Sequence, residues 1–393
     1  MKIALVYSRF TIYSGIQINI QDYANELSKK GYEVYVLGQK IDKKLYTFNK
    51  NVKLFEIGGP ISFNPLHWIT LGLIRRKFLN ILKIINPDIV ISHNFPANFF
   101  CTEKNKNKTY THIFYCHEPY LYFYDKTYYS NLPPLLRIIS CILRLFFKKY
   151  DYKSVKKADA IMCNSKFIQK KILRSYGEKS IIQYPVLNMD NIKKKSFNIF
   201  RELNIEPSTP IIFVLGLTHN MKGTAELFYI FQKILDKIPE TILLIGGYMI
   251  NENKRIISHL VKELNIPKKN IVIYGFIDKE ILGSFYNNAT LTVYTAIGEG
   301  FGQIPLESMK NGTPVIAFNY GGPSETIINN KTGFLIRVGN LQEFADRAIQ
   351  IIQNENLRKR FSKNCLAHIE KKFGFKKAIS KFEEIIKNVH FKS

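Results

Sequence analysis

Short apolar segments alternate with longer segments of helical spacing along the whole chain of 393 residues. The apolar segments have the length and composition of buried β-strands. Strands that alternate with helices in this way favour parallel sheets with helices packed on both faces. A chain of this length is also too long for one typical core. We therefore expect an α/β protein built from two successive doubly wound domains.

A polar, basic segment over residues 188–198 separates the predicted strands into two sets. The predicted strands cover residues 2–7, 32–37, 89–92, 111–115 and 160–163 in the first set, and residues 211–215, 241–245, 271–274, 291–295 and 314–318 in the second. We interpret the polar segment as a linker. The predicted domains are therefore residues 1–190 and 200–372, followed by a helical segment over residues 373–393.

The cysteines and the N-terminus indicate a cytoplasmic protein. The five cysteines are widely spaced and include no Cys-x-x-Cys pair, which is typical of reduced thiols and argues against a structural zinc site. Residues 1–7 start directly with a strand pattern, unlike a signal peptide. The longest apolar runs are shorter than a membrane-spanning helix requires.

The net charge of +26 is concentrated in the first half of the chain. Residues 1–200 contain 32 Lys and Arg against 13 Asp and Glu, a net charge of +19, whereas the remaining residues carry +7. A basic surface of this kind suits a nucleic acid or an anionic membrane. No zinc-finger, recognition-helix or aromatic RNA-binding signature accompanies the charge, which favours the membrane. A biased coding composition would explain the total charge but not its asymmetry.

The segment Gly298-Glu-Gly-Phe-Gly-Gln-Ile-Pro-Leu-Glu307 joins a predicted strand to a predicted helix. Its glycines let the backbone approach a ligand closely, and Pro305 fits only in the first turn of the helix. The free N–H groups of that turn form an anion site suited to phosphate. Glu299 and Glu307 flank the turn and can accept hydrogen bonds from sugar hydroxyls. The segment therefore suggests a nucleotide-sugar site, and an ordinary α/β loop is the alternative interpretation.

Other candidate site residues follow predicted strands in both halves. In sheets of this kind, ligands bind at the carboxyl ends of the strands. Gly15 and His117 follow strands of the first half, and Gly216, Lys222 and Phe276 follow strands of the second half. This convergence favours a functional site over a chance arrangement.

Three segments of the second half resemble the retaining glycosyltransferases of family 4, which have the GT-B fold. They are Glu299-Gly-Phe-Gly-Gln-Ile-Pro-Leu-Glu307, which is similar to the family's Glu-x7-Glu motif, Met309-Lys-Asn-Gly-Thr-Pro-Val-Ile-Ala317, and Gly321-Gly-Pro-Ser-Glu325. The first half matches more loosely, through Gly15, Gly31-Tyr-Glu-Val34, Pro87-Asp88 and His117-Glu-Pro119. The resemblance implies two Rossmann-like domains facing across a cleft. The first would bind the acceptor and the second the nucleotide-sugar, with the closing helix crossing back to the first.

The resemblance also implies roles for individual residues. Glu299, His117 and Lys222 form the implied catalytic set: Glu299 would bind a hydroxyl of the transferred sugar, His117 would contact that sugar, and Lys222 would hold the diphosphate. Glu307 would bind the ribose hydroxyls, and Gly15 would face the phosphates or the acceptor. The other residues implied in donor binding are Gly216, Phe276 against the nucleotide base, and Gly302, Gln303 and Ile304 around the diphosphate.

Two positions depart from the family pattern. Leu217 stands where the family has an arginine, so Lys222 is the only matched cation for the diphosphate. Ser14-Gly15 replaces a doubled glycine, which leaves a side chain where close approach to the ligand is expected. Both departures bear on the geometry of the phosphate site.

The implied activity is transfer, with retention of configuration, of a hexose-type sugar from a nucleotide-diphosphate sugar to a glycan or lipid-linked acceptor in envelope polysaccharide or glycolipid assembly. The donor is a substrate, and no cofactor is expected. No Asp-x-Asp motif lies near the candidate residues, so we expect transfer without a metal ion. Fixed dipoles and Lys222 would instead stabilise the leaving diphosphate.

Two basic, apolar segments of the first half are candidate membrane contacts. Residues 135–149 place apolar side chains around most of a helix that also carries Arg137 and Arg144, and residues 67–77 are similar in composition. This pattern fits either a buried helix or a helix that lies on anionic lipid. We hypothesise a peripheral enzyme on the inner face of the membrane.

Three other functions fit part of the pattern. A sugar-nucleotide epimerase could share the two-domain fold and would need no acceptor. An NAD-dependent dehydrogenase requires a Gly-x-Gly-x-x-Gly turn after the first strand, where this chain has only Ser14-Gly15. A non-catalytic protein bound to nucleic acid would account for the basic charge.

Overall fold

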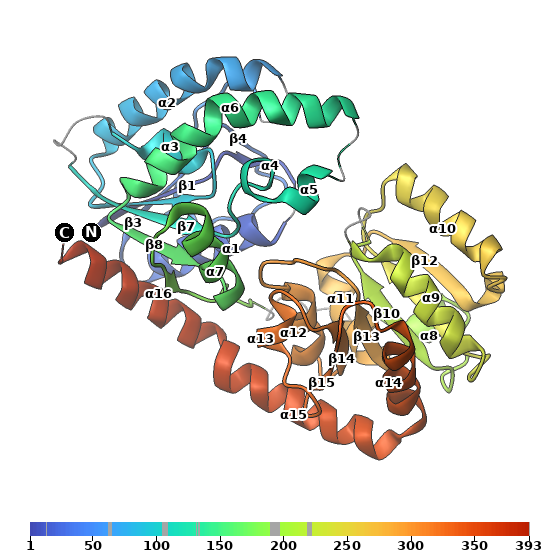
Figure 1. Cartoon of the computed structure of the whole chain (residues 1–393). Helices are drawn as coiled ribbons and strands as arrows, with labels where there is room; N and C mark the ends of the chain where they lie inside the picture. The colour runs from blue at the N-terminus through green and yellow to red at the C-terminus, as the bar shows by residue number, and fades with distance from the viewer. Residues whose placement is uncertain are drawn as a thin grey trace. The chain divides into compact units, whose positions relative to one another are not determined.

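A computed structural model describes the chain apart from residues 13, 62–64, 104–108, 131, 133, 189–196, 218–221 and 393. The chain divides into two compact units (Figure 1). Unit 1 consists of Met1–Val186 together with Phe375–Ser393, and unit 2 consists of Leu187–Gly374. Most of the predicted linker lies outside the described residues.

Unit 1 contains a parallel sheet with the strand order β5-β3-β1-β6-β7-β8-β9. Its strands are β1 (Lys2–Val6), β3 (Glu33–Gly38), β5 (Lys53–Glu56), β6 (Ile89–His93), β7 (Thr111–Cys116), β8 (Ala160–Cys163) and β9 (Ile181–Ile182), and a separate pair is formed by β2 (Arg9–Phe10) and β4 (Lys40–Ile41). Its helices are α1 (Gly15–Lys29), α2 (Pro65–Ile85), α3 (Ala97–Cys101), α4 (Leu121–Tyr124), α5 (Lys126–Ser130), α6 (Pro134–Lys156), α7 (Lys166–Tyr176) and α16 (Phe375–His390).

The central strand of unit 1 is buried on both faces. Ile3 and Leu5 of β1 join a core cluster with residues of α1 and α16, whereas Ala4 and Val6 join a cluster with residues of α2 and α3. Successive side chains of a strand point to opposite faces, so a strand covered by helices on both sides is apolar throughout. The uninterrupted apolar pattern of this strand therefore indicates a parallel sheet with helices packed on both faces.

Helix α16 is fixed to unit 1 by stacking and by hydrogen bonds. The ring of Phe382 stacks on Tyr23 of α1 with their centroids 3.9 Å apart. Gln183 Nε2 donates to the backbone oxygen of Ala378 (3.0 Å) and to the Tyr23 hydroxyl (3.1 Å). The last helix of the chain thus packs with the first helix.

Unit 2 contains a second parallel sheet, with the strand order β12-β11-β10-β13-β14-β15. Its strands are β10 (Ile211–Leu215), β11 (Ile242–Gly246), β12 (Ile271–Gly275), β13 (Leu291–Tyr294), β14 (Val315–Phe318) and β15 (Gly333–Ile336). Its helices are α8 (Ile199–Glu202), α9 (Thr224–Leu235), α10 (Asn251–Glu263), the 3-10 helix Lys268–Asn270, α11 (Lys279–Asn288), α12 (Gln303–Lys310), α13 (Pro323–Thr326), α14 (Leu341–Gln353) and α15 (Glu355–Phe373).

The order of strands in unit 2 reverses between β10 and β13, since the chain first adds β11 and β12 on one side and later β13 to β15 on the other. Such a reversal leaves a crevice at the carboxyl ends of the two central strands. The predicted α/β class with doubly wound sheets is confirmed. Among the described residues, no helix combines the length and the apolar character that crossing a bilayer requires.

Candidate functional site

An ion pair lies at the carboxyl end of the unit 2 sheet. Lys222 Nζ is 2.6 Å from Glu299 Oε2, and both side chains are partly exposed. Lys222 precedes α9, which follows β10, and Glu299 follows β13, so the pair spans the two central strands where the strand order reverses. The structure therefore brings together two of the predicted site residues that are 77 positions apart.

The backbone beside Lys222 is held against the end of β13. The Thr295 hydroxyl donates to the backbone oxygen of Lys222 (2.9 Å). Gly223 caps α9 with φ of +71°, and a Cβ at this position would lie 2.3 Å from the backbone oxygen of Thr295. Only glycine fits such a close approach in the left-handed region. The contacts of Lys222 and Gly223 with Thr295 therefore fix the backbone position from which the Lys222 side chain extends.

Two further glycines support the loop that carries Glu299. The backbone N–H of Gly322 donates to the backbone oxygen of Glu299 (2.9 Å). A Cβ at Gly321 would lie 2.6 Å from that same oxygen, and a Cβ at Gly322 would lie 2.0 Å from the backbone oxygen of Phe301. The Gly321-Gly322 pair thus lets one backbone segment lie directly on another, and this contact positions the Glu299 loop.

Helix α12 begins at Gln303, directly after Gly302, which has φ of +75°. Pro305 lies in the first turn, as predicted, where its missing N–H leaves no hydrogen bond unmade. Ile304 packs 3.6 Å from the Cβ position of Gly216 at the end of β10. The predicted phosphate-binding residues of α12 therefore lie beside the end of the central strand.

Glu307 lies further along α12 and contacts a buried tyrosine. The Tyr286 hydroxyl donates to Glu307 Oε2 (2.9 Å). Burial raises the pKa of the Glu307 carboxyl above its ordinary value, while the Tyr286 hydrogen bond and the charge of Lys279 lower this pKa in part. Among the described residues, Oε1 accepts no hydrogen bond. The carboxylate thus has one oxygen anchored and one available to a ligand.

We expect Tyr286→Phe to move the acid limb of donor binding to higher pH. The ionised form of Glu307 is the stronger acceptor for hydroxyls, so binding weakens as pH falls through the raised pKa. Removing the Tyr286 hydroxyl removes a group that stabilises the carboxylate, which raises this pKa further. Titration of nucleotide affinity against pH checks this result, and identical acid limbs in variant and wild type would contradict it.

Two exposed aromatic side chains lie at the carboxyl edge of the sheet. Phe276 follows β12 and is 72% exposed, and Tyr248 follows the neighbouring strand β11 and is also 72% exposed. Phe276 was predicted, whereas Tyr248 was missed although it too follows a strand. Lys279, at the start of α11, was also missed, and its influence on Glu307 depends on a contact between distant segments.

Leu217, which stands at the position of the family's arginine, is 2% exposed and belongs to the apolar core of unit 2. Its backbone oxygen accepts a hydrogen bond from Asn253 Nδ2 (2.7 Å). The side chain at this position therefore contributes to packing and supplies no charge. Among the described predicted residues of unit 2, Lys222 remains the cation of the site.

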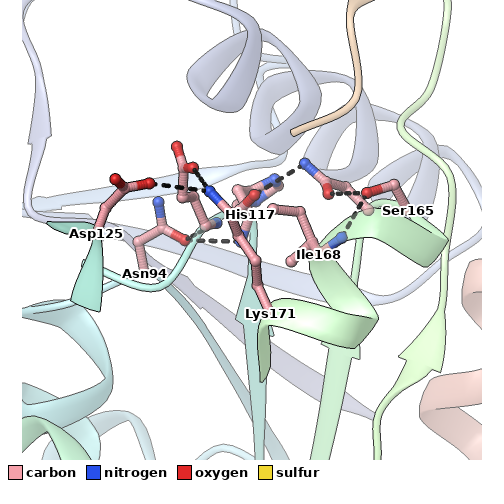
Figure 2. Close-up of polar contacts among 8 residues, drawn as sticks. Asn94, His117, Asp125, Ser165, Ile168 and Lys171 are labelled. Atoms are coloured by element: carbon pink, nitrogen blue, oxygen red, sulfur yellow. Dashed lines mark hydrogen bonds and ion pairs between the residues drawn. The ribbon is translucent and has the colours of Figure 1, made fainter. Parts of the chain in front are cut away.

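His117 follows β7 in unit 1 and is held by both of the neighbouring strand ends (Figure 2). Its backbone N–H donates to Asn94 Oδ1 (2.7 Å), and Asn164 Nδ2 donates to its backbone oxygen (3.1 Å). Its imidazole is 5% exposed, stacks on Tyr115, and places Nε2 3.0 Å from Nδ1 of His93. Burial lowers the pKa of His117 to about 3. The imidazole is therefore neutral at physiological pH.

Charged groups surround the loop that begins at His117. Lys171 Nζ lies 2.8 Å from Glu118 Oε1 and 3.4 Å from Asp125 Oδ2. The Ser165 hydroxyl caps α7, the helix of Lys171, by accepting from the backbone N–H of Ile168 (3.0 Å). Figure 2 shows Lys171 pointing toward Asp125 from α7. These contacts connect the loop to the start of α7 in unit 1.

Gly15 is the first residue of α1 in unit 1, and Ser14 is its cap residue in an extended conformation. Gly15 accepts from Asn19 Nδ2 through its backbone oxygen (2.8 Å), and Ser14 Oγ contacts the side-chain oxygen of Gln17. The predicted residues thus form two groups, Gly15 and His117 in unit 1, and the Lys222–Glu299–Glu307 set in unit 2. No group of three His, Cys, Asp or Glu side chains in the described part of the chain could hold a metal ion.

Two family models match the chain, one in each unit. The model for glycosyl transferases group 1 matches residues 195–367, and the model for glycosyltransferase family 4 matches residues 13–186. The capsular polysaccharide biosynthesis glycosyltransferase CapM of Staphylococcus aureus is 29% identical over 198 residues, which is 50% of each chain.

Solved structures match the chain over its whole length. Sucrose-phosphate synthase from Thermosynechococcus elongatus has a TM-score of 0.83 at 18% identity and covers 100% of both chains. HepE of Anabaena in complex with UDP has a TM-score of 0.77 at 14% identity, covering 99% of this chain and 100% of HepE. At these identities the likeness concerns the fold.

Proposed function

We propose that the chain, which matches the models for glycosyl transferases group 1 and glycosyltransferase family 4, is a GT-B glycosyltransferase. It would transfer a hexose-type sugar from a nucleotide-diphosphate sugar to a glycan or lipid-linked acceptor. We further propose that the enzyme belongs to family 4 and that it retains the anomeric configuration of the transferred sugar. The acceptor is proposed to be part of the cell envelope, which would place the enzyme at the inner face of the membrane.

The observation that carries this proposal is the ion pair between Lys222 and Glu299 beside the first turn of α12. A diphosphate needs positive charge and N–H donors, which the ammonium group and the helix N-terminus supply. A sugar presents hydroxyl donors, which a carboxylate accepts. On donor binding, the phosphates would replace Glu299 as the ion-pair partner of Lys222. The Glu299 carboxylate would then accept hydrogen bonds from the sugar hydroxyls.

Glu307 is proposed to bind the nucleoside. A ribose offers adjacent hydroxyls, and the carboxylate has Oε2 anchored by Tyr286 while Oε1 faces no described partner. Phe276, whose side chain is 72% exposed, offers an apolar surface against which a nucleotide base could pack. The two contacts would orient the nucleotide so that its diphosphate lies toward Lys222.

The proposed chemistry is stabilisation of the leaving nucleoside diphosphate. When the bond to the sugar breaks, negative charge grows on the phosphate oxygens and positive charge on the sugar ring. Lys222 and the dipole of α12 are fixed in advance where the phosphate charge develops, which is the arrangement that lowers a barrier most. We propose that these groups suffice without a metal ion and that the acceptor attacks from the face that the diphosphate leaves.

Unit 1 is proposed to bind the acceptor, and His117 to contact the transferred sugar. Nε2 of His117 shares a hydrogen bond with Nδ1 of His93. Nδ1 of His117 is therefore the nitrogen proposed for the sugar contact. The neutral imidazole could exchange hydrogen bonds with a hydroxyl but would not contribute charge. The name of CapM, which refers to capsular polysaccharide, supports an acceptor in the cell envelope.

A panel of nucleotides and nucleotide-sugars, based on UDP, GDP and ADP, tests the donor site through thermal unfolding. A donor present at one hundred times its Kd stabilises the folded protein by about 2.7 kcal/mol. We expect one base to give this stabilisation and Glu307→Ala to abolish it. Equal stabilisation of the variant, or none by any compound, would contradict the proposal. Epimerised nucleotide-sugar as the product would favour an epimerase instead.

A further inference from the structure

Helices α2 and α6 present a large apolar surface on unit 1. Exposed apolar residues lie in the first half of α2 and along α6: Leu66, Ile69 and Leu73, and Leu135, Leu136, Ile138, Ile139, Ile142, Leu145 and Phe146. We refer to these side chains as the α2/α6 surface. Ile69 is 79% exposed and Leu145 is 75% exposed. The prediction that residues 135–149 could form a buried helix is therefore wrong for this half of α6.

The two helices lie side by side over the same face of the sheet (Figure 1). Trp68 of α2 and Phe147 of α6 pack ring against ring, with centroids 5.1 Å apart. Both side chains are partly buried and pack against the core cluster on that face, so each helix contacts the core by its inner side. The exposed apolar residues are on the remaining sides, where they gain nothing from the core.

The charged residues within the two helical stretches that carry this surface are of one sign. Residues 65–85 and 134–150 contain no Asp or Glu, although together they contain eight Lys and Arg. Arg76, Lys77, Arg144 and Lys149 are exposed. The first acidic residue of α6 is Asp151, which is buried and accepts hydrogen bonds from Asn98 and Tyr176. No carboxylate of these two stretches therefore offsets the exposed cations.

We propose that the α2/α6 surface docks on an anionic lipid bilayer. Exposed apolar side chains flanked by cations are what an interfacial helix requires, because the apolar groups enter the acyl boundary while the cations meet the headgroups. A contiguous apolar patch on a soluble protein marks an interaction site. A second copy of the chain fits less well, since two such surfaces would bring cations against cations with no acid from either stretch between them.

This docking deepens the proposed function, since a lipid-linked acceptor is presented at a membrane surface. Only the link between docking and a lipid-linked acceptor rests on the proposed function. Vesicle binding needs neither donor nor acceptor, so a failure to bind vesicles and a failure to transfer sugar are separate results. The eight Lys and Arg of these two stretches are part of the positive charge that is concentrated in the first half of the chain.

Co-sedimentation of the full chain with vesicles tests the surface. We expect binding to vesicles containing phosphatidylglycerol and phosphatidylcholine, and weaker binding to phosphatidylcholine alone or at high salt. Leu145→Glu combined with Phe146→Glu should lower the affinity at least tenfold. The matched control is Leu173→Glu combined with Leu366→Glu, since these leucines are also exposed but lie on α7 and α15. The control should bind like the wild type.

The cations are tested in the same assay with a charge-matched pair of variants. Arg144→Gln combined with Lys149→Gln should lower binding to anionic vesicles roughly tenfold or more, because each basic residue near the headgroups adds to the attraction. Lys170→Gln combined with Arg174→Gln removes the same charge from exposed positions of α7. Equal losses in the two variants would show that net charge alone attracts the vesicle, which would overturn the docking surface.

Cys141 allows a direct measurement at the surface, because it is exposed on α6 while the other four cysteines are buried. A solvent-sensitive fluorophore attached to Cys141 should shift to shorter emission wavelengths when anionic vesicles are added. Unchanged emission, with the protein bound to the vesicles, would overturn the proposed orientation. Concentration-dependent dimers that Leu145→Glu disrupts, without vesicle binding, would assign the surface to self-association instead.

Discussion

Replacing Lys222 by alanine should lower the rate of sugar transfer by about a hundredfold or more while leaving the protein folded. The ammonium group lies at the end of the central strand, 2.6 Å from the Glu299 carboxylate, where the departing diphosphate is proposed to gain charge. Removing one group that stabilises such a charge typically costs about 10² to 10³ in rate. The core residue Leu217 supplies no charge in its place. Hydrolysis of the donor identified by thermal unfolding measures this effect without knowledge of the acceptor.

The effect on stability should be small by comparison. The Lys222 and Glu299 side chains are 20% and 36% exposed, and ion pairs of this kind contribute about 0 to 1 kcal/mol to folding. Lys237→Ala, which removes an exposed lysine after α9, is the matched control and should retain full activity. Near wild-type turnover in both Lys222→Ala and Glu307→Ala would exclude the proposed donor site.

Gly322→Ala should lower the free energy of unfolding of unit 2 by about 3 kcal/mol, which is the upper end of the range for overpacking. The added Cβ would lie 2.0 Å from the backbone oxygen of Phe301, and a backbone atom cannot move aside as the end of a side chain can. Relief of the clash must displace the Glu299 loop, so donor affinity should fall at least tenfold as well. Hydrogen exchange of peptides covering β13 and β14 in increasing urea measures the loss locally.

A second glycine provides the control for this substitution. Gly72 lies within α2, and a Cβ there would meet nothing within 4 Å. Gly72→Ala should therefore stabilise the protein by about 1 kcal/mol, because alanine favours a helix over glycine. If Gly322→Ala were as well tolerated as Gly72→Ala, the contact between the Gly321-Gly322 backbone and the Glu299 loop would not position the site.

Much of the unit 2 site could be predicted from the sequence because its residues belong to local patterns. The glycine-rich turn, Pro305 in a first helical turn and the two glutamates lie within ten consecutive residues. Lys222 could be predicted because it is followed by a glycine after a strand. Each of these signals depends on the backbone conformation of a few neighbouring residues, which short-range sterics largely determine.

The partners of these residues could not be predicted in the same way. Tyr286 anchors Glu307 and His93 shares a hydrogen bond with His117, yet neither stands in a recognisable pattern with its partner. The pairs lie on different elements, and only the packing of the sheet and its helices brings them together. Leu217 was likewise read as a missing cation, whereas its burial shows that the position is part of the core.

The sequence by itself determined the α/β class, the presence of two doubly wound units and the motif of the proposed donor site. This was possible because apolar strands alternate with helices along the whole chain. The spacing of apolar residues within each segment indicates which of its side chains are buried. Only the tertiary structure decided which face of α6 is buried. An apolar helix has the same local pattern in a core and on a lipid surface, and the exposure of Ile138 and Leu145 depends on what the rest of the fold leaves uncovered.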